Sequence, residues 1–262
     1  MNLNLQGKTA LVCGSSQGIG QAIASQLASQ GASIVLFARN SQALEKVKNS
    51  LNTQQGQQHQ ILVADFTRID KVKTVIKQFI SGGGHAEILI NNTGGPAPGP
   101  AHEASANEYL NAFQQHLINA QNILQCLLPG MKEAGYGRII NVISTSVKQP
   151  LNGLGVSNTI RGAMASWGKT LANELGPYAI TVNNVLPGAT NTTRLNTIFQ
   201  TLSTKLGISP EQAAENEKQS IPLRRFAEPE EFANAVGFLV SEAAAYISGI
   251  NLPVDGGKIS CL

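Results

Sequence analysis

"TALVCGSSQGIGQAIASQLASQGASIVLFARN", residues 9–40, decides the fold of this chain. An apolar run ends at a glycine-rich turn, an amphipathic segment follows, and a second apolar run occupies residues 33–38. Glycine lets the backbone approach a ligand closely, and a helix that starts in such a turn offers unpaired N–H groups and a positive dipole end. The stretch predicts a strand–turn–helix–strand unit that binds phosphate, the alternative being a glycine-rich turn without a ligand.

The rest of the chain repeats this alternation of short apolar runs and amphipathic segments. Helices are expected over residues 18–30, 41–52, 69–81, 106–134 and 158–175, and strands in "TALVCG", "SIVLFA", "QILVAD", "EILINN", "RIINVIS", "ITVNNVLPG" and "NLPVDGG". The runs are apolar throughout, as strands covered by helices on both sheet faces should be. The pattern predicts an α/β fold: a doubly wound, Rossmann-type parallel sheet of about seven strands in a single domain, residues 1–262.

Composition narrows the function classes. The net charge is +3, and no long run of one sign marks a nucleic-acid surface. Cys13, Cys126 and Cys261 are too far apart for metal-ligand spacing or a disulfide framework, and no eighteen apolar residues run together. We therefore expect a cytoplasmic protein with no metal, no nucleic-acid partner and no membrane partner.

Two segments interrupt the alternation. "TGGPAPGPAHEAS", residues 93–105, is too rich in glycine and proline for a regular element and predicts a loop at the carboxyl end of the sheet, where such folds bind ligands. A polar helical segment follows the sixth strand, at residues 192–222. It is the candidate substrate lid.

Five motifs resemble those of the short-chain dehydrogenase/reductase family. The Gly-x-x-x-Gly-x-Gly spacing of Gly14, Gly18 and Gly20 comes first, and "NNTG" (91–94), "NVIS" (141–144), "TVNNVLPGATNT" (181–192) and "YISGINLPVDGG" (246–257) follow in family order. The resemblance covers essentially the whole chain. Within the family, the chain is similar to the 3-oxoacyl-acyl-carrier-protein reductases. It implies an NAD(P)-dependent oxidoreductase.

The resemblance also implies which residues hold the cofactor. Asp65 stands where the family's acidic residue contacts the adenine ring, although Asp65 also suits the start of the following helix. Asn91 and Gly94 are expected to line the pocket. The full set of implied cofactor residues is Gly14, Ser16, Gln17, Gly18, Ile19, Gly20, Arg39, Asp65, Phe66, Asn92, Gly94, Arg161, Pro187, Gly188 and Thr192.

The end of the second strand indicates which cofactor is used. An acidic residue there would bond the adenosine ribose 2′-OH, whereas "FARN" places Arg39 at this point. Arginine pairs with a phosphate through two parallel charge-assisted hydrogen bonds. We therefore expect NADP(H) in preference to NAD(H). Gln17 supplies no second basic residue, and an exposed surface charge is the alternative for Arg39.

The reaction site departs from the family pattern. Family members use a Ser, a Tyr, a Lys four residues after the Tyr, and an Asn. Ser144 matches the serine, but Ser157 stands at the tyrosine position and Arg161 at the lysine position. His116 stands at the Asn position, with Asn119 one turn later.

These replacements change the chemistry. A serine hydroxyl is a weaker acid than a phenol and is shorter, so Ser157 cannot act as the tyrosine does; its alternative role is to cap a helix start. Arg161 can bond ribose hydroxyls or an anionic substrate, the alternative being a solvated helix charge. His116 titrates near neutral pH and is the candidate replacement acid, the alternative being a packed or a surface residue.

Two functions follow from these residues. The first is an NADPH-dependent short-chain oxidoreductase that reduces a small-molecule carbonyl or acyl substrate of the 3-oxoacyl type, with Ser144, Ser157, Arg161 and His116 as its atypical catalytic set. The alternative is a catalytically silent NADP(H) sensor or partner subunit. The resemblance further implies a homotetramer or homodimer, with residues 106–134 and the helix after 158 as shared surfaces.

Overall fold

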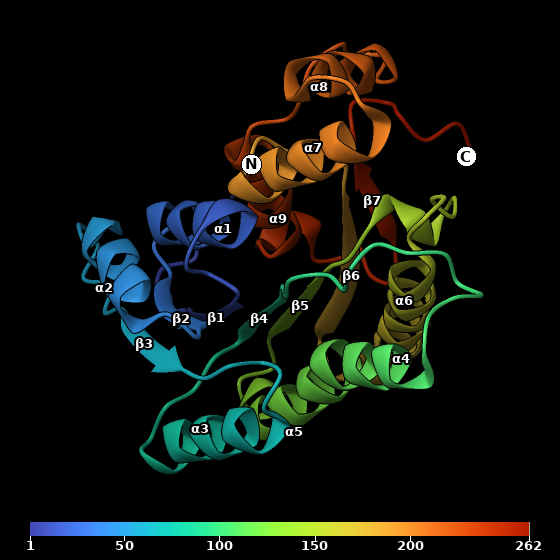
Figure 1. The fold of residues 1–262 in the computed structure, drawn as a ribbon. Coiled ribbons are helices and arrows are strands. Elements are labelled where there is room, and N and C mark those ends of the chain that lie inside the picture. The colour runs from blue at the N-terminus through green and yellow to red at the C-terminus, as the bar shows by residue number, and fades with distance from the viewer. Residues whose placement is uncertain (262) are drawn as a thin grey trace.

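The computed structural model describes residues 1–261, the side chain of Lys205 excepted, and contains a seven-stranded parallel sheet in these residues. The strand order is β3-β2-β1-β4-β5-β6-β7 (Figure 1). The strands are β1 (Thr9–Cys13), β2 (Ser33–Ala38), β3 (Gln60–Val63), β4 (Ile88–Asn91), β5 (Gly137–Val142), β6 (Ile180–Pro187) and β7 (Asn251–Val254). The predicted doubly wound sheet is confirmed.

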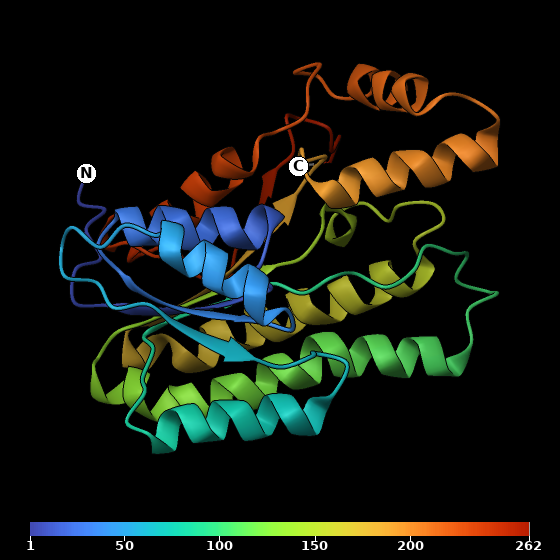
Figure 2. The ribbon, with the colours of Figure 1, turned by 60° about the vertical axis from the view of Figure 1, so that its left-hand side comes forward.

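Helices cover both faces of the sheet (Figure 2). On one face lie α1 (Gly18–Ser29), α2 (Ser41–Ser50) and α9 (Pro229–Leu239); on the other lie α3 (Ile69–Ser81), α4 (Ala106–Phe113), α5 (Asn119–Glu133) and α6 (Gly155–Leu175). Successive strand residues alternate between the two cores: Val12 packs in the first, while Leu11 and Cys13 pack in the second. Both faces of the central strands are therefore buried, which explains why these strands are mostly apolar.

Two expected helix boundaries differ from the structure. The segment expected as one helix over 106–134 divides into α4, a π-helical turn at Gln114–Ile118, and α5, which contains Pro129. The helix expected from residue 158 begins at Gly155, so Ser157 lies inside its first turn. Short 3₁₀ turns occur at Thr145–Val147, Gly176–Tyr178 and Glu242–Ala244.

The strand order reverses between β1 and β4, and the glycine turn lies at their carboxyl ends. Gly14 has φ +61°, and a Cβ there would lie 2.4 Å from the carbonyl oxygen of Asn92. A Cβ on Gly20 would lie 2.2 Å from the carbonyl oxygen of Gly14. Only glycine fits at these two positions, so the turn is closed tightly against the end of β4.

An asparagine ladder, Asn91–Asn141–Asn184–Asn251, crosses four neighbouring strands. The Nδ2 of Asn91 donates to Oδ1 of Asn141 at 2.9 Å. Asn141 donates to Asn184, and Asn184 to Asn251, each at 2.8 Å. Asn91 is therefore turned into the sheet. The sequence predicts that Asn91 lines the cofactor pocket, but its amide is committed to this ladder and it does not line the cavity at the carboxyl edge of the sheet.

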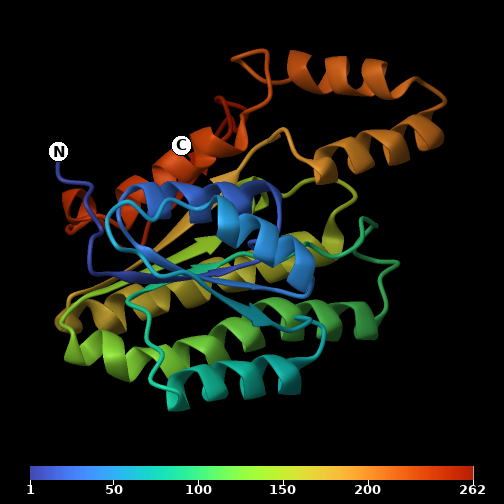
Figure 3. The same ribbon diagram turned by 90° about the vertical axis from the view of Figure 1, so that its left-hand side faces the viewer.

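The segment after β6 forms two helices, α7 (Thr193–Leu206) and α8 (Pro210–Gln219). They pack against each other and project from the rest of the domain beyond the carboxyl edge of the sheet (Figure 3). Thr192 caps α7, since its side chain accepts a hydrogen bond from the N–H of Leu195. The helical content expected for residues 192–222 is thus present.

Candidate active site

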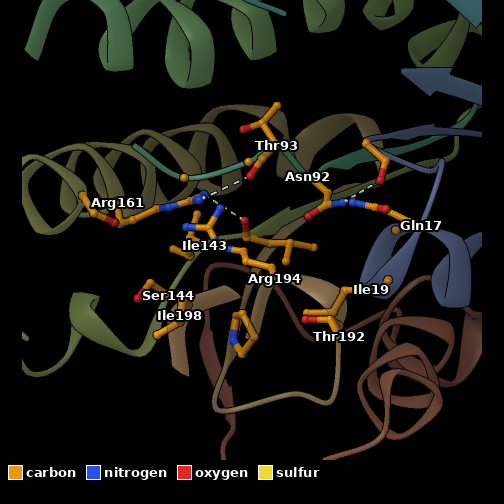
Figure 4. Close-up of a pocket in the computed structure, with 18 of the residues that line it drawn as sticks. Gln17, Ile19, Asn92, Thr93, Ile143, Ser144, Arg161, Thr192, Arg194 and Ile198 are labelled. Carbon is orange, nitrogen blue, oxygen red and sulfur yellow. Dashed lines mark hydrogen bonds between the residues drawn. The ribbon is translucent and has the colours of Figure 1, made fainter. Parts of the chain in front are cut away.

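A cavity of about 370 Å³ opens at the carboxyl edge of the sheet, between the glycine turn, the ends of β4 and β5, the start of α6 and the start of α7 (Figure 4). It brings together much of the expected site. The expected residues that line it are Gly14, Gln17, Gly18, Ile19, Gly20, Asn92, Gly94, Ser144, Ser157, Arg161, Pro187 and Thr192.

The glycine turn fits an anion. Gln17 is the N-cap of α1 but makes no side-chain capping bond, and the first turn of α1 contains no acidic residue. The N–H groups at this helix end are thus left for a ligand, with the positive end of the helix dipole behind them. Asn92 fixes the turn from the neighbouring strand: its Nδ2 lies 3.3 Å from each of the carbonyl oxygens of Cys13 and Gly14.

Arg39 and Asp65 follow β2 and β3 at the same sheet edge, outside this cavity. The Arg39 side chain is 76% exposed, and its Nη1 lies 3.9 Å from Oδ2 of Asp65. Hydrogen bonds from the backbone and side chain of Thr67 lower the pKa of Asp65, and Arg39 contributes to a smaller extent. Arg39 is therefore an exposed cation in a long ion pair with Asp65, and its guanidinium is accessible to a phosphate.

Three other expected cofactor residues also lie outside the cavity lining. Ser16 is half-buried in the glycine turn. Phe66 is buried, and its ring packs against Phe37 with centroids 5.0 Å apart. Gly188 packs on the C-terminal segment, where a Cβ would lie 2.6 Å from Cα of Asp255. Phe66 and Gly188 therefore have packing roles in this structure.

Ser144 and Ser157 border the cavity from different elements. Ser144 lies two residues after the end of β5, and its Oγ accepts a hydrogen bond from the N–H of Ser146 at 3.1 Å. This contact leaves its own O–H proton to donate. Ser157 does not cap α6, because the N-cap is Leu154. The capping alternative for Ser157 is therefore wrong.

Arg161 lies one turn after Ser157 and is 7% exposed. Its Nη1 donates to the carbonyl oxygen of Val142 at 3.1 Å, and its Nη2 lies 3.4 Å from the carbonyl oxygen of Thr93. Burial, and then the charge of Arg194, lower the pKa of Arg161 to about 10. The guanidinium is still charged at neutral pH, and its burial rules out the alternative of a solvated helix charge.

His116 lies behind Arg161 and does not line the main cavity. It is buried in the π-helical turn, with Nδ1 2.5 Å from Oγ1 of Thr93, and its Nε2 has no hydrogen-bond partner among the described residues. Burial, and then the charges of Arg161 and Arg194, lower the pKa of His116 to about 3. The structure thus argues against His116 as the replacement acid, because a neutral imidazole is a poor proton donor near neutral pH and His116 does not line the cavity.

The sequence reasoning missed Arg194, which lines the cavity from the first turn of α7. Its side chain reaches the β4–α4 loop, where a Cβ on Gly95 would lie 2.8 Å from Nη2 of Arg194. One signal could have revealed it. A cation in the first turn of a helix opposes the helix dipole, so the arginine directly after "ATNTT" (residues 189–193) needs a reason other than helix stability.

Within residues 1–261, no three His, Cys, Asp or Glu side chains gather in a way that could hold a metal ion. No helix described in the structure has the length and apolar character needed to cross a bilayer.

Comparison with known proteins identifies the class of protein that this fold and cavity define. Residues 14–258 match the family described as Enoyl-(Acyl carrier protein) reductase. The chain belongs to the short-chain dehydrogenase/reductase family of oxidoreductases, as the motifs predicted.

Individual relatives match over nearly their full lengths. The NADPH-dependent reductase BacG of Bacillus subtilis is 32% identical over 256 residues, which are 97% of this chain and 99% of BacG. The 3-oxoacyl-[acyl-carrier-protein] reductase FabG of Pseudomonas aeruginosa is 33% identical over 257 residues, 97% of this chain and 98% of FabG. The structure of L-sorbose reductase from Gluconobacter frateurii, complexed with NADPH and L-sorbose, superposes with a TM-score of 0.93 at 33% identity and covers 100% of both chains.

Proposed function

We propose that this chain reduces a 3-oxoacyl-type carbonyl substrate with NADPH, through an active site altered at the tyrosine and lysine positions. The observation that carries the proposal is that Ser144, Ser157 and Arg161 border one cavity with the glycine turn. The predicted preference for NADP(H) is confirmed by the relatives, since BacG is NADPH-dependent and the sorbose reductase was solved with NADPH.

The residues present fit this cofactor. The uncapped start of α1 suits the pyrophosphate, Arg39 suits the 2′-phosphate, and Arg161, which lines the same cavity as the glycine turn, would bond the nicotinamide ribose. Pro187 and Thr192 border the same cavity on the side of α7. Bound NADPH would supply a hydride to the carbonyl carbon.

The chain itself must hold the substrate oxygen and stabilise the negative charge that develops on it. Ser144 has a free O–H proton to donate to that oxygen, and the charged Arg161 lies in the same cavity. Among the described residues, the cavity lining contains no Asp, Glu, His, Cys, Lys or Tyr. We infer that water delivers the proton, because no lining side chain titrates near neutral pH and Ser157 leaves the space of a phenol open.

The test uses the purified protein, first in fluorescence titrations with NADPH and NADH. NADPH consumption is then followed with the thioester S-3-oxobutanoyl-N-acetylcysteamine. We expect NADPH to bind more tightly than NADH, and turnover to be abolished in Arg161→Ala but retained in the control Lys46→Gln, on the exposed face of α2. Unchanged turnover in Arg161→Ala contradicts the role of Arg161, and absence of NADPH binding contradicts the glycine-turn assignment.

The second candidate function is a silent NADP(H) sensor or a partner subunit. Among the described residues, no side chain that lines the cavity is a proton donor near neutral pH, and this favours the silent function, because the cofactor-binding features remain while the usual proton donor is missing. It predicts tight NADPH binding without hydride transfer on a broad carbonyl and alcohol panel. Turnover by protein prepared free of host reductases would exclude it.

We further propose that α7 and α8 act as the substrate lid.

We also propose that the protein forms a homodimer or homotetramer in the cytoplasm. Two large apolar side chains of α4 support a shared surface at this helix: Leu110 is 58% exposed and Phe113 38% exposed. Light scattering on a sizing column would measure the assembly, and a monomer at micromolar concentration would contradict it.

A further inference from the structure

Arg161 and Arg194 come from different elements and converge in the cavity (Figure 4). Arg161 reaches it from α6, and Arg194 from the first turn of α7. A Cβ atom on Gly95 would lie 2.8 Å from Nη2 of Arg194 and 3.5 Å from Nη2 of Arg161. Both guanidinium groups therefore border the same small volume beside the β4–α4 loop.

The two charges are not neutralised by the protein. Among residues 1–261, neither Arg161 nor Arg194 has a carboxylate within 4.0 Å, and no acidic residue lines the cavity. Two like charges in a partly desolvated space repel each other, and this repulsion contributes to the lowered pKa of Arg161. An anion between them would relieve that repulsion.

The guanidinium of Arg161 is also held in a fixed orientation at the cavity. Two backbone carbonyl groups, of Val142 and Thr93, accept hydrogen bonds from its Nη1 and Nη2. A guanidinium carries five N–H donors, so these two contacts position Arg161 without exhausting its donors. The positive end of the α7 dipole lies beside Arg194 and adds to the field at the same point.

We propose that Arg161 and Arg194 together bind a carboxylate of the substrate, so that the preferred substrate is an oxo acid with a free carboxylate rather than its ester or thioester. This inference rests on the proposed function, in which the same cavity holds the carbonyl group. A carboxylate matches the planar fork of a guanidinium and accepts hydrogen bonds from two arginines at once. Arg194 would bring the lid helix α7 onto the bound acid.

The phosphates of the cofactor are the other anions that could bind between Arg161 and Arg194, but the start of α1 offers them a separate site. The N–H groups that suit the pyrophosphate lie at the start of α1, and a Cβ on Gly18 would meet Thr192, 3.3 Å from its Cγ2. In Figure 4, Gln17, Ile19 and Thr192 lie together at one end of the cavity, whereas Arg194 lies beside Arg161. The Arg194 guanidinium therefore points toward Gly95 and Arg161 rather than toward the start of α1.

The test is a calorimetric titration of the protein saturated with NADP⁺, which cannot donate a hydride. The probes are 3-oxobutanoate and its neutral methyl ester. We expect the acid to bind at least about tenfold more tightly than the ester, and Arg194→Gln to weaken the acid about tenfold while leaving the ester unchanged. Lys46→Gln, which removes one positive charge from the exposed face of α2, should keep the wild-type preference.

Three results would overturn the inference. The first is equal affinity of the wild-type protein for the acid and the ester, and the second is no binding of either probe. The third is an Arg194→Gln variant that binds NADP⁺ more weakly but keeps the wild-type ratio of acid affinity to ester affinity. The proposed function fails separately, if NADPH is not consumed with acid, ester or thioester. In that case, tighter binding of the acid than of the ester would still support the anion site. If the protein does not bind NADP⁺, the two probes are titrated in the absence of NADP⁺.

Discussion

Two regions of the molecule border the cavity in different ways. One consists of β1, α1 and the end of β4, and the other consists of β5 and the start of α6. The first binds through backbone: Gly14 and Gly20 are fixed because a Cβ would strike main-chain atoms. The second presents the side chains of Ser144, Ser157 and Arg161 to the cavity. Side chains can be exchanged without disturbing α6, whereas the glycines cannot, so cofactor binding and reaction chemistry can change independently.

The largest expected effect comes from the backbone region. Gly20→Val places atoms within 2.2 Å of the Gly14 carbonyl oxygen and should abolish measurable NADPH binding, because the turn must open to admit them. Fluorescence titration measures the loss, and circular dichroism checks folding. The matched control is Gly130→Ala in α5, where a Cβ meets nothing within 4 Å; it should stabilise the protein by roughly 0.5–1 kcal/mol. NADPH binding retained in Gly20→Val would break the comparison.

Restoring the family pair tests the side-chain region. Ser157→Tyr combined with Arg161→Lys should raise kcat on the 3-oxobutanoyl thioester by about 100-fold, since a positioned general acid contributes that much or more. NADPH affinity should change little, because the glycine turn is untouched. Ser157→Phe with Arg161→Lys has the same bulk without the hydroxyl and should gain nothing. A gain in the Phe variant would show that packing rather than proton delivery had been restored.

His116 lies between the two regions and should make stability depend on pH. Its pKa is about 3 in the folded protein, below the usual unfolded value of about 6.5, so protonation favours unfolding. Stability is full above pH 6.5 and falls as the pH drops toward 3, by roughly 2 kcal/mol at pH 5. Urea unfolding at pH 7 and pH 5 measures this loss. His116→Asn should remove the share of this loss that comes from His116. If the variant loses as much stability between pH 7 and pH 5 as the wild-type protein, that result contradicts the burial argument.

The smallest effect is expected at Arg39, which acts through an exposed side chain. Arg39→Ala should weaken NADPH binding about tenfold and leave NADH binding unchanged, because only NADPH carries the 2′-phosphate. Parallel titrations with both cofactors give the ratio. Equal weakening of both would mean that Arg39 contacts a part that the two cofactors share.

Local signals in the sequence were sufficient for the sheet and the glycine turn. The runs at residues 33–38 and 69–81 coincide with β2 and α3, because their apolar spacing is set by local periodicity. Side-chain direction was less predictable. β4 is buried on both faces, so its composition does not distinguish the inward Asn91 from the cavity-lining Asn92.

Residues that depend on distant elements could not be assigned from sequence. The burial of His116 follows from a π-helical turn packed behind Arg161, which no local motif marks. The reach of Arg194 to Gly95 depends on how α7 lies over the β4–α4 loop. Both are tertiary effects, and both bear on the reaction site rather than on the fold.

The asparagine ladder gives the sheet a means of rejecting misaligned strands. β4, β5, β6 and β7 are parallel strands brought together from distant parts of the chain, and β4 and β5 are buried along their whole length. Hydrophobicity alone distinguishes poorly between a correct pairing and one slipped by two residues. In the native pairing Asn91 lies opposite Asn141, and Asn184 lies opposite both Asn141 and Asn251. A slip would leave buried amides unpaired at about 1–3 kcal/mol each, so polar groups inside the sheet select one alignment among several that bury the same apolar surface.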